Sequence, residues 1–510
     1  MAIVAVCGAF VAPRVSAELW MPSVFGDHMV LQQDARVPVW GTADPGQTVQ
    51  VEVAGKSGSA KADAQGNWRV DLRDLEDGGP HTMTVTAGNN SRSFSDVLVG
   101  EVWVCSGQSN MQWSVSQSAD PENEIAAADY PTLRLFHVER ETSDTPKRDC
   151  NAKWTATTPE TITGFSAVAY YFGRELQKLR GVPVGLIHTS WGGTTAEAWT
   201  SLPVLEAGPA FEPILDRWDT VINRYPEALE KYQEDRKAWE AERDKARAEG
   251  TDVPRAPRAP QGPADPNRPA NLYNAMIAPL VPYGIQGAIW YQGESNAGRA
   301  YQYRDLLPAM IGNWRDVWDQ GRFPFLIVQL ANFMERNTEP EESAWAELRE
   351  AQSMTAAQRG NGLAVIIDIG EADDIHPRNK QDVGRRLAYA AQEVAYRERG
   401  FPSSGPIYKS HRVRGGEIEL RFDHVHGGLE AAGGGPLKGF TVAPKEGPFV
   451  WADARIEGDK VIVSSPSVPN PAAVRYGWAN NPDCNLYNAA GLPASPFRTD
   501  DRPGVTVDAK

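Results

Sequence analysis

The sequence predicts an α/β protein in which a doubly wound domain with a parallel sheet is flanked at both ends by β-sandwich-like regions. Residues 19–98 form short alternating runs separated by Gly, Asp and Asn, a pattern typical of a small antiparallel sandwich. Between 98 and 400, nearly continuous apolar runs alternate with helical stretches, which indicates buried parallel strands joined by helices. Alternating runs return from about residue 405.

The length of the chain supports several domains, because 510 residues are too many for one compact core. We therefore expect an N-terminal β-sandwich domain over 18–97, the α/β domain over 98–400 and a C-terminal β domain over 401–510. Residues 205–270 interrupt the alternation of strands and helices, and we expect a helical and proline-rich insertion there.

The individual elements follow from hydrophobic periodicity. The strands expected in the N-terminal region are 37–40, 48–53, 68–72 and 81–86. The α/β domain has apolar runs that predict buried strands at 97–105, 184–189, 287–291, 325–330 and 363–369. Helical patterns lie between them at 165–179, 344–357 and 380–397. Near the C-terminus, strands are expected at 417–422 and 460–463.

The insertion has two parts. Pro226 is expected to begin a charged helix over 227–249, with a thin apolar seam at three-four spacing formed by Leu229, Tyr232, Arg236 and Trp239. Prolines then occur at every third position from 254 to 269, which matches the three-residue turn of a polyproline II helix. This stiff segment is interpreted as a spacer that returns the chain to the sheet, in preference to a wall beside a substrate cleft.

Composition excludes several classes of function. A formal net charge of −15 argues against a nucleic-acid partner, since such proteins present basic faces. No apolar run reaches the ~18 residues of a membrane-spanning helix. Residues 1–17 form an apolar stretch ending in a small-residue cleavage pattern, so we expect a signal peptide and a secreted or periplasmic protein. Without this leader, Cys105, Cys150 and Cys484 remain, an odd and sparse set that forms neither a disulfide framework nor a zinc-ligand pattern.

Ser109 is the candidate nucleophile. It follows the first buried strand in Ser-Gly-Gln-Ser-Asn-Met, so it is expected on a tight turn at the carboxyl edge of the sheet, where α/β proteins bind ligands. Gly107 would permit the turn, and the start of the following helix would favour a developing negative charge. Met111 stands where the Gly-x-Ser-x-Gly motif of α/β-hydrolases has its last glycine, so the sequence does not match that family. Taken alone, such a serine is more often a helix cap.

His376 is the candidate base, because it follows another buried strand in a loop that also contains Asp373 and Asp374. A histidine oriented by a carboxylate can accept a proton from a serine. His188 also lies near a strand end, but we expect it to pack within the sheet. His424 and His426 share one face of an expected strand, and a surface strand is favoured there over a metal pair.

Two glycine-rich turns follow buried strands and are expected near Ser109. One turn contains Gly192 and Gly193, and the other contains Gln292. Backbone amides of these turns and the side-chain amide of Gln292 could converge on one oxyanion. Five further side chains are expected to bind substrate or orient the site: Gln108, Asn110, Trp191, Glu294 and Asn296. Four tryptophans adjoin these motifs, and at least half of them are expected to pack in the core instead of stacking on sugars: Trp113, Trp191, Trp199 and Trp290.

Together these motifs resemble the sialate O-acetylesterase family of SGNH-type carbohydrate esterases. Gly-Gln-Ser-Asn-Met, Ser-Trp-Gly-Gly-Thr, Trp-Tyr-Gln-Gly-Glu-Ser-Asn and Asp-Ile-His-Pro occur in family order. The resemblance implies a flavodoxin-like SGNH hydrolase domain over 98–400 and hydrolysis of acetyl esters on sugars, with no metal and no other cofactor. Ser109 would attack the acetyl carbonyl and His376 would accept its proton. The oxyanion would be held by the amide of Ser109, by Gly192 or Gly193, and by Gln292.

The resemblance leaves the acid and the substrate open. The SGNH spacing Asp-x-x-His selects Asp373, which is slightly favoured, whereas the Asp-Ile-His-Pro motif selects Asp374. The expected partner is an acetylated sugar, oligosaccharide or glycan: a sialate, or a neutral xylan or xyloglucan, to which the charge of −15 is no obstacle. A non-catalytic carbohydrate-binding protein is the alternative from another class. The oligomeric state is left open.

Overall fold

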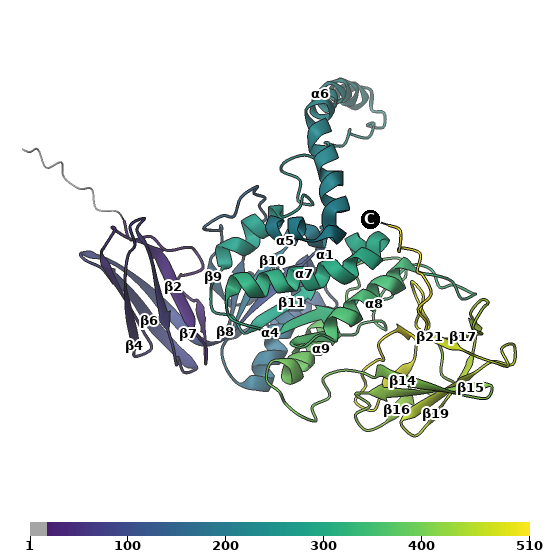
Figure 1. The fold of residues 1–510 in the computed structure, drawn as a ribbon. Coiled ribbons are helices and arrows are strands. Elements are labelled where there is room, and N and C mark those ends of the chain that lie inside the picture. Colours follow the sequence, from purple (N-terminus) through teal and green to yellow (C-terminus); the bar gives the residue numbers. More distant parts are fainter. Residues whose placement is uncertain (1–17, 510) are drawn as a thin grey trace, which may run out of the picture.

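The structure is a computed structural model that describes residues 18–509, so the expected signal peptide lies outside the described residues. Its centre is a mixed α/β domain with a mostly parallel sheet (Figure 1). Neighbouring strands in this sheet are parallel except for the last pair, which is antiparallel. In spatial order the strands are β13 (Asn361–Ala364), β12 (Phe325–Val328), β11 (Gly287–Tyr291), β7 (Asn90–Gly107), β10 (Val184–Ser190), β8 (Tyr130–His137) and β9 (Trp154–Thr157).

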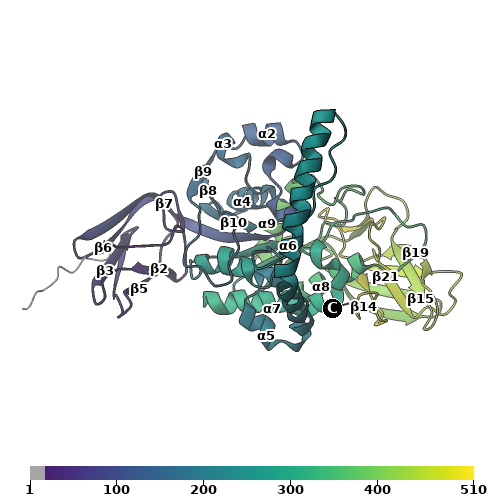
Figure 2. The ribbon, with the colours of Figure 1, turned by 90° about the horizontal axis from the view of Figure 1, so that it is seen from above.

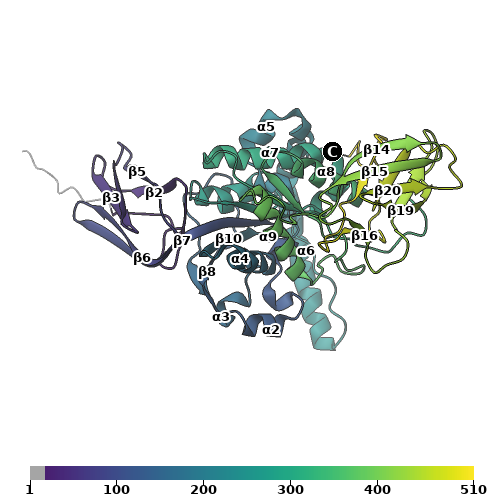
Figure 3. The ribbon, with the colours of Figure 1, turned by 90° about the horizontal axis from the view of Figure 1, so that it is seen from below.

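Helices cover both faces of this sheet, as the continuous apolar runs predict. The helix α7 (Ala300–Trp318) packs against α8 (Ala344–Ala356) on one face, and α4 (Ala167–Arg180) packs against α9 (Lys380–Val394) on the other (Figure 3). Because the chain moves outward from β7 in both directions, β7 is the point where the strand order reverses. Ligands of open α/β sheets bind outside the carboxyl ends of the strands at such a point.

The strand β7 belongs to two sheets. Its first part pairs with β6 (Gly78–Ala87) and β1 (Val30–Gln32) in the N-terminal domain, and its second part pairs with β10 and β11. The expected domain boundary at 97/98 therefore falls inside a continuous strand (Figure 1). The rest of the N-terminal domain comprises β2 (Val37–Thr42), β3 (Thr48–Val53), β4 (Lys56–Lys61) and β5 (Asn67–Leu72).

The C-terminal β domain has its own apolar core. One antiparallel sheet contains β14 (Ile407–Arg414), β15 (Glu417–Asp423), β20 (Lys460–Ser464) and β19 (Asp453–Glu457). Another contains β18 (Val450–Trp451), β17 (Phe440–Ala443), β21 (Ala473–Tyr476) and β23 (Phe497–Arg498). A two-stranded sheet pairs β16 (Leu429–Ala431) with β22 (Leu486–Asn488).

The last residues of the chain return to the α/β domain. The carboxylate of Glu347, fully buried in α8, accepts hydrogen bonds from the amides of Val505 and Thr506 and from the Thr506 hydroxyl. The tail therefore packs on the α/β domain, beyond the C-terminal β domain in which the sequence placed it (Figure 1).

The insertion corrects one expectation. Pro226 does not begin the helix but lies inside α6 (Glu212–Glu249), which projects from the body of the molecule (Figures 1 and 2). The additional first part buries Ile214 and Trp218, and this burial offsets the hydrogen bond that an internal proline removes. The segment after α6 runs back along it, where the Trp239 indole N–H donates to the Pro254 carbonyl over 2.7 Å. Among residues 18–509, no helix has the length and apolar character of a membrane span.

Candidate active site

Ser109 lies on the turn at which β7 ends and α1 (Ser109–Gln112) begins. The turn requires glycine at position 107, where φ is +145° and a Cβ atom would lie 2.1 Å from the Tyr291 carbonyl oxygen. In the sheet register, Gly107 pairs with Ser190 of β10 and with Tyr291 of β11. The loops that follow these three strands therefore surround Ser109 at the carboxyl edge of the sheet.

His376 contacts Ser109 directly. Its Nε2 atom lies 2.9 Å from the Ser109 Oγ atom, although the two residues are 267 positions apart in the sequence. The histidine is carried by the loop between β13 and α9, which leaves the same sheet edge. The distance is that of a hydrogen bond from a nucleophilic hydroxyl to its base.

The structure places Asp374, and not the slightly favoured Asp373, beside the histidine. The Asp374 Oδ1 atom lies 3.4 Å from His376 Nδ1 and accepts the His376 backbone N–H over 2.8 Å. The Asp373 side chain is exposed, and within residues 18–509 no hydrogen bond or ion pair joins it to His376. The distance from Asp374 Oδ1 to His376 Nδ1 is long for a hydrogen bond. Because Asp374 binds the backbone of His376, the pair shares one tight turn.

Two further groups act on His376. The Trp113 ring stacks on the imidazole, with centroids 4.7 Å apart and planes inclined by 11°. Burial lowers the pKa of His376; the nearby Asp374 charge opposes this effect, and the positive charge of Lys380 adds to it. The stacked ring restrains the plane of the imidazole, and burial favours its neutral form.

Below Ser109 lies a buried polar cluster. Asn110 donates from Nδ2 to Glu294 Oε1 over 2.6 Å and to the Ile375 carbonyl over 3.0 Å, and it accepts from Lys380 Nζ over 2.5 Å. Burial lowers the pKa of Lys380 to about 7 and raises that of Glu294. Because Ile375 precedes His376, the cluster connects the turn of Ser109 to the loop that carries His376.

The glycine-rich turn after β10 also lies against Ser109. A Cβ atom on Gly192 would lie 3.2 Å from Ser109 Cβ, and the Gly192 N–H donates to Gln112 Oε1 over 2.7 Å. Gly193 has a φ of +75°, a conformation that glycine adopts without strain. The amide of Ser109 is the first of α1, where N–H groups have no partner within the helix.

Comparison with known proteins gives a consistent family. The sequence profile of the family described as "Carbohydrate esterase, sialic acid-specific acetylesterase" matches residues 99–244 and 264–393. The chain belongs to this family. It is therefore an esterase, and the predicted resemblance is confirmed.

Its relatives match over nearly the whole chain. Sialate O-acetylesterase of Homo sapiens is 30% identical over 548 residues, which cover 94% of this chain and 93% of that protein. The Mus musculus protein of the same name is 29% identical over 530 residues, covering 93% of each. A crystal structure of "a novel carbohydrate acetylesterase from Xanthomonas citri" has a TM-score of 0.80 and 39% identity, and it covers 95% of this chain and 100% of that one.

In the esterase, the side-chain amide of Gln292 forms hydrogen bonds with three neighbouring residues. Its Nε2 group donates to the Thr194 carbonyl over 3.2 Å and to Asn296 Oδ1 over 2.7 Å, and its Oε1 atom accepts from the Tyr303 hydroxyl over 2.8 Å. Asn296 Nδ2 in turn donates to the buried Glu197 carboxylate over 3.0 Å. Both amide hydrogens of Gln292 are thus engaged within the framework that also holds Asn296.

The remaining expected side chains of the esterase divide into framework and surface groups. Gln108 Oε1 accepts the amides of Gly293 and Ser295, each over 3.3 Å, so it holds the turn after β11 against that of Ser109. Trp199 and Trp290 are fully buried, as expected for at least half of the tryptophans. Trp191 is partly exposed beneath the Arg140 guanidinium, 5.6 Å from its ring.

The other histidines of the esterase lie apart from Ser109. His188 is buried against His137 and Phe165, as expected for a residue within the sheet. His424 and His426 lie beyond the end of β15 with positive φ angles, so they do not share a strand face. Among the described residues, no three His, Cys, Asp or Glu side chains are placed to hold a metal ion.

Lys380 is the functional candidate that the sequence did not indicate. A lysine at the first position of an amphipathic helix is normally solvated, so its residue type gave no signal of burial. Only its proximity to the Asp-Ile-His-Pro motif could have drawn attention to it.

Proposed function

We propose that the esterase hydrolyses acetyl esters on a sugar, with Ser109 as nucleophile, His376 as general base and Asp374 as the residue that orients the histidine. The observation that carries the proposal is the 2.9 Å contact between Ser109 Oγ and His376 Nε2 at the point where the strand order reverses. Membership of a carbohydrate esterase family supplies the class of reaction.

In the proposed mechanism, His376 removes the hydroxyl proton as Ser109 Oγ attacks the acetyl carbonyl carbon. The tetrahedral intermediate collapses when the imidazolium returns the proton to the sugar oxygen, which leaves as an alcohol. Water then attacks the acetyl-Ser109 ester while His376 accepts one of its protons. The imidazolium returns this proton to Ser109 Oγ as the bond between the acyl carbon and Oγ breaks, and acetic acid leaves and ionises to acetate.

The amide of Ser109 is the proposed donor to the oxyanion, together with an amide of the Gly192–Gly193 turn. Gly192 is the nearer candidate, because its Cα position faces Ser109 Cβ. Its N–H donates a hydrogen bond to Gln112 Oε1. Gln112 would therefore have to release this hydrogen when the substrate carbonyl arrives. Gly193 is the alternative donor.

The proposed substrate is an O-acetylated glycan. The relatives' names point to sialates, whereas the Xanthomonas citri protein is called a carbohydrate acetylesterase without a stated sugar. A net charge of −15 offers no long-range attraction to an anionic sialate. This observation favours a second candidate, an acetylated neutral plant-wall glycan such as xylan or xyloglucan.

The test is acetate release from p-nitrophenyl acetate and from acetylated xylan, xyloglucan and sialosides. Ser109→Ala and His376→Ala are each expected to lower kcat by several orders of magnitude. Ser93→Ala, an exposed serine on the N-terminal part of the same strand, serves as the matched control and keeps the parent rate. Retained activity in Ser109→Ala refutes the nucleophile. A parent without activity on any of these esters favours a non-catalytic carbohydrate-binding protein.

A further inference from the structure

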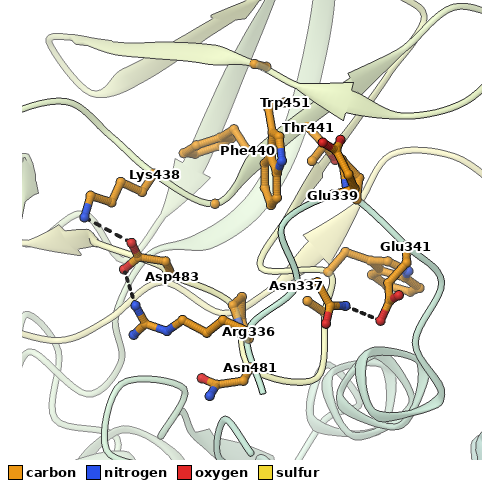
Figure 4. A pocket seen from close by; sticks show the side chains of 16 residues that line it. Arg336, Asn337, Glu339, Glu341, Lys438, Phe440, Thr441, Trp451, Asn481 and Asp483 are labelled. Carbon is orange, nitrogen blue, oxygen red and sulfur yellow. Dashed lines mark hydrogen bonds and ion pairs between the residues drawn. The ribbon is translucent and has the colours of Figure 1, made fainter. Parts of the chain in front are cut away.

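A pocket of about 380 Å3 lies between the loop that joins β12 to α8 and the C-terminal β domain (Figure 4). The loop contributes Arg336, Asn337 and Glu339, and the β domain contributes Lys438, Phe440 and Trp451. None of these residues takes part in the contacts around Ser109. The pocket is therefore separate from the candidate catalytic groups.

The feature that distinguishes this pocket is an exposed indole. Trp451 is 46% exposed, and its ring points into the centre of the pocket (Figure 4). The side chain is held in place from both sides, because its strand pairs with Thr441 and its Nε1 atom donates to the Thr338 carbonyl over 2.9 Å. A positioned aromatic ring that remains open to solvent offers a flat apolar surface to a ligand.

Polar side chains surround this ring. Asp483 accepts from Lys438 Nζ over 3.0 Å and lies 3.6 Å from an Arg336 nitrogen, while Asn337 donates to Glu341 (Figure 4). Both cations thus share one carboxylate, and the carboxylates of the lining outnumber its cations. Such a lining offers hydrogen bonds but disfavours an anion.

The pocket is also tied to the loop of the proposed base. The Met334 N–H donates to the Ala372 carbonyl over 3.0 Å, and the Gly370 N–H donates to Asn332 Oδ1 over 2.7 Å. Asn481 of the pocket lining donates to the Met334 carbonyl over 2.6 Å. Hydrogen bonds therefore connect the wall of the pocket to the loop that carries His376.

We propose that this pocket is a second carbohydrate subsite, in which Trp451 stacks on a neutral pyranose ring of the glycan that carries the acetyl group. When a pyranose ring stacks on an indole, the hydroxyl groups of the sugar point outward around its edge. There the charged and amide side chains of the pocket can form hydrogen bonds with them. That the bound glycan is the substrate rests on the proposed function. The binding itself does not require turnover.

The experiment is calorimetric titration of the full-length Ser109→Ala protein with xylohexaose, a neutral pyranose chain without acetyl groups. The parent pocket binds it, and adding Trp451→Ala raises Kd about three- to tenfold because the stacking surface is lost. Trp451→Phe is expected to retain most of the affinity because it keeps an aromatic ring for stacking, although it loses the hydrogen bond to the Thr338 carbonyl. Val413→Ala, 47% exposed on β14 and outside the pocket, is the matched control and leaves Kd unchanged.

Three results would overturn the subsite. They are no binding of xylohexaose at millimolar concentration, the same Kd in Trp451→Ala as in the parent, and tighter binding of 3′-sialyllactose than of xylohexaose. Thermal unfolding of each variant identifies a loss of fold. Acetate release by the Ser109-containing parent tests the proposed function independently, so either idea can fail without the other.

Discussion

The indole of Trp113 lies parallel to the imidazole of His376, with an angle of 11° between the rings. The imidazole of a base must keep one nitrogen aimed at the nucleophile and the other at the acid, and it can rotate about two side-chain bonds. The stacked ring limits this rotation from one face, while Ser109 and Asp374 contact the two nitrogens.

Replacing Trp113 by alanine is therefore expected to lower kcat on p-nitrophenyl acetate by about tenfold, the range of one aromatic contact. Trp113→Phe retains a flat ring and most of the rate. Equal rates in the parent and in Trp113→Ala would show that His376 is oriented without the stack.

Asp374→Asn is expected to lower kcat by about 100-fold or more, because a neutral amide no longer stabilises the imidazolium. Asp373→Asn is the matched control, since this exposed carboxylate forms no ion pair with His376 in the described residues. It is expected to keep the parent rate to within about twofold. A larger loss of kcat in Asp373→Asn than in Asp374→Asn would show that Asp373 is the residue that orients His376.

The pH profile of kcat/KM reports the base of the free enzyme. His376 must be neutral to accept a proton, and burial lowers its pKa from the ordinary 6.5. The midpoint of the acid side of the profile, at which half of the imidazole is protonated, is therefore expected below pH 6.5. A midpoint at or above 6.5 for the acid side of the profile would contradict this environment.

Lys380 is expected to act as a positioning residue through Asn110 and through its charge. Lys380→Met removes a positive charge near His376, so the pKa of the imidazole rises and the acid side of the profile moves to higher pH. A purely structural role would lower kcat without moving this midpoint. Arg385→Met, on the same helix and paired with Asp382 away from the site, should leave the profile in place.

Glu347 is expected to hold the C-terminal tail. Glu347→Gln replaces charge-assisted hydrogen bonds to the amides of Val505 and Thr506, at a cost of about 2 kcal/mol. The tail should then be cut faster by carboxypeptidase, as followed by mass spectrometry. The exposed Glu430→Gln provides a control. Unchanged cleavage in Glu347→Gln would show that other contacts hold the tail.

Much of the central domain was predictable, because strands buried on both faces must be apolar along their whole length. The runs around Val104, Ile187, Ile289 and Ile327 all became neighbouring strands of one sheet. Ser109 and His376 could be brought together from their positions after such runs, since the carboxyl ends of parallel strands share an edge.

The rest depended on contacts between distant residues. Gln292 follows a strand at the expected place, but its amide is consumed by Thr194 and Asn296, neither of which is adjacent to it in sequence. Pro226 marked a helix start by local preference alone, and the burial of Ile214 and Trp218 overrode that preference. The choice between Asp373 and Asp374 depended on the shape of one turn.

Because a single strand carries both the N-terminal sandwich and the residue before the nucleophile's turn, the two parts have no hinge between them. Deleting the chain up to residue 97 would remove both β6 and β1, which pair with the first part of β7, and would leave the new end of β7 without these partners next to β10. The N-terminal domain is thus expected to melt together with the sheet that holds Ser109, as one cooperative unit. Truncation would be a mutation of the active-site scaffold, however far the deleted residues lie from the ester.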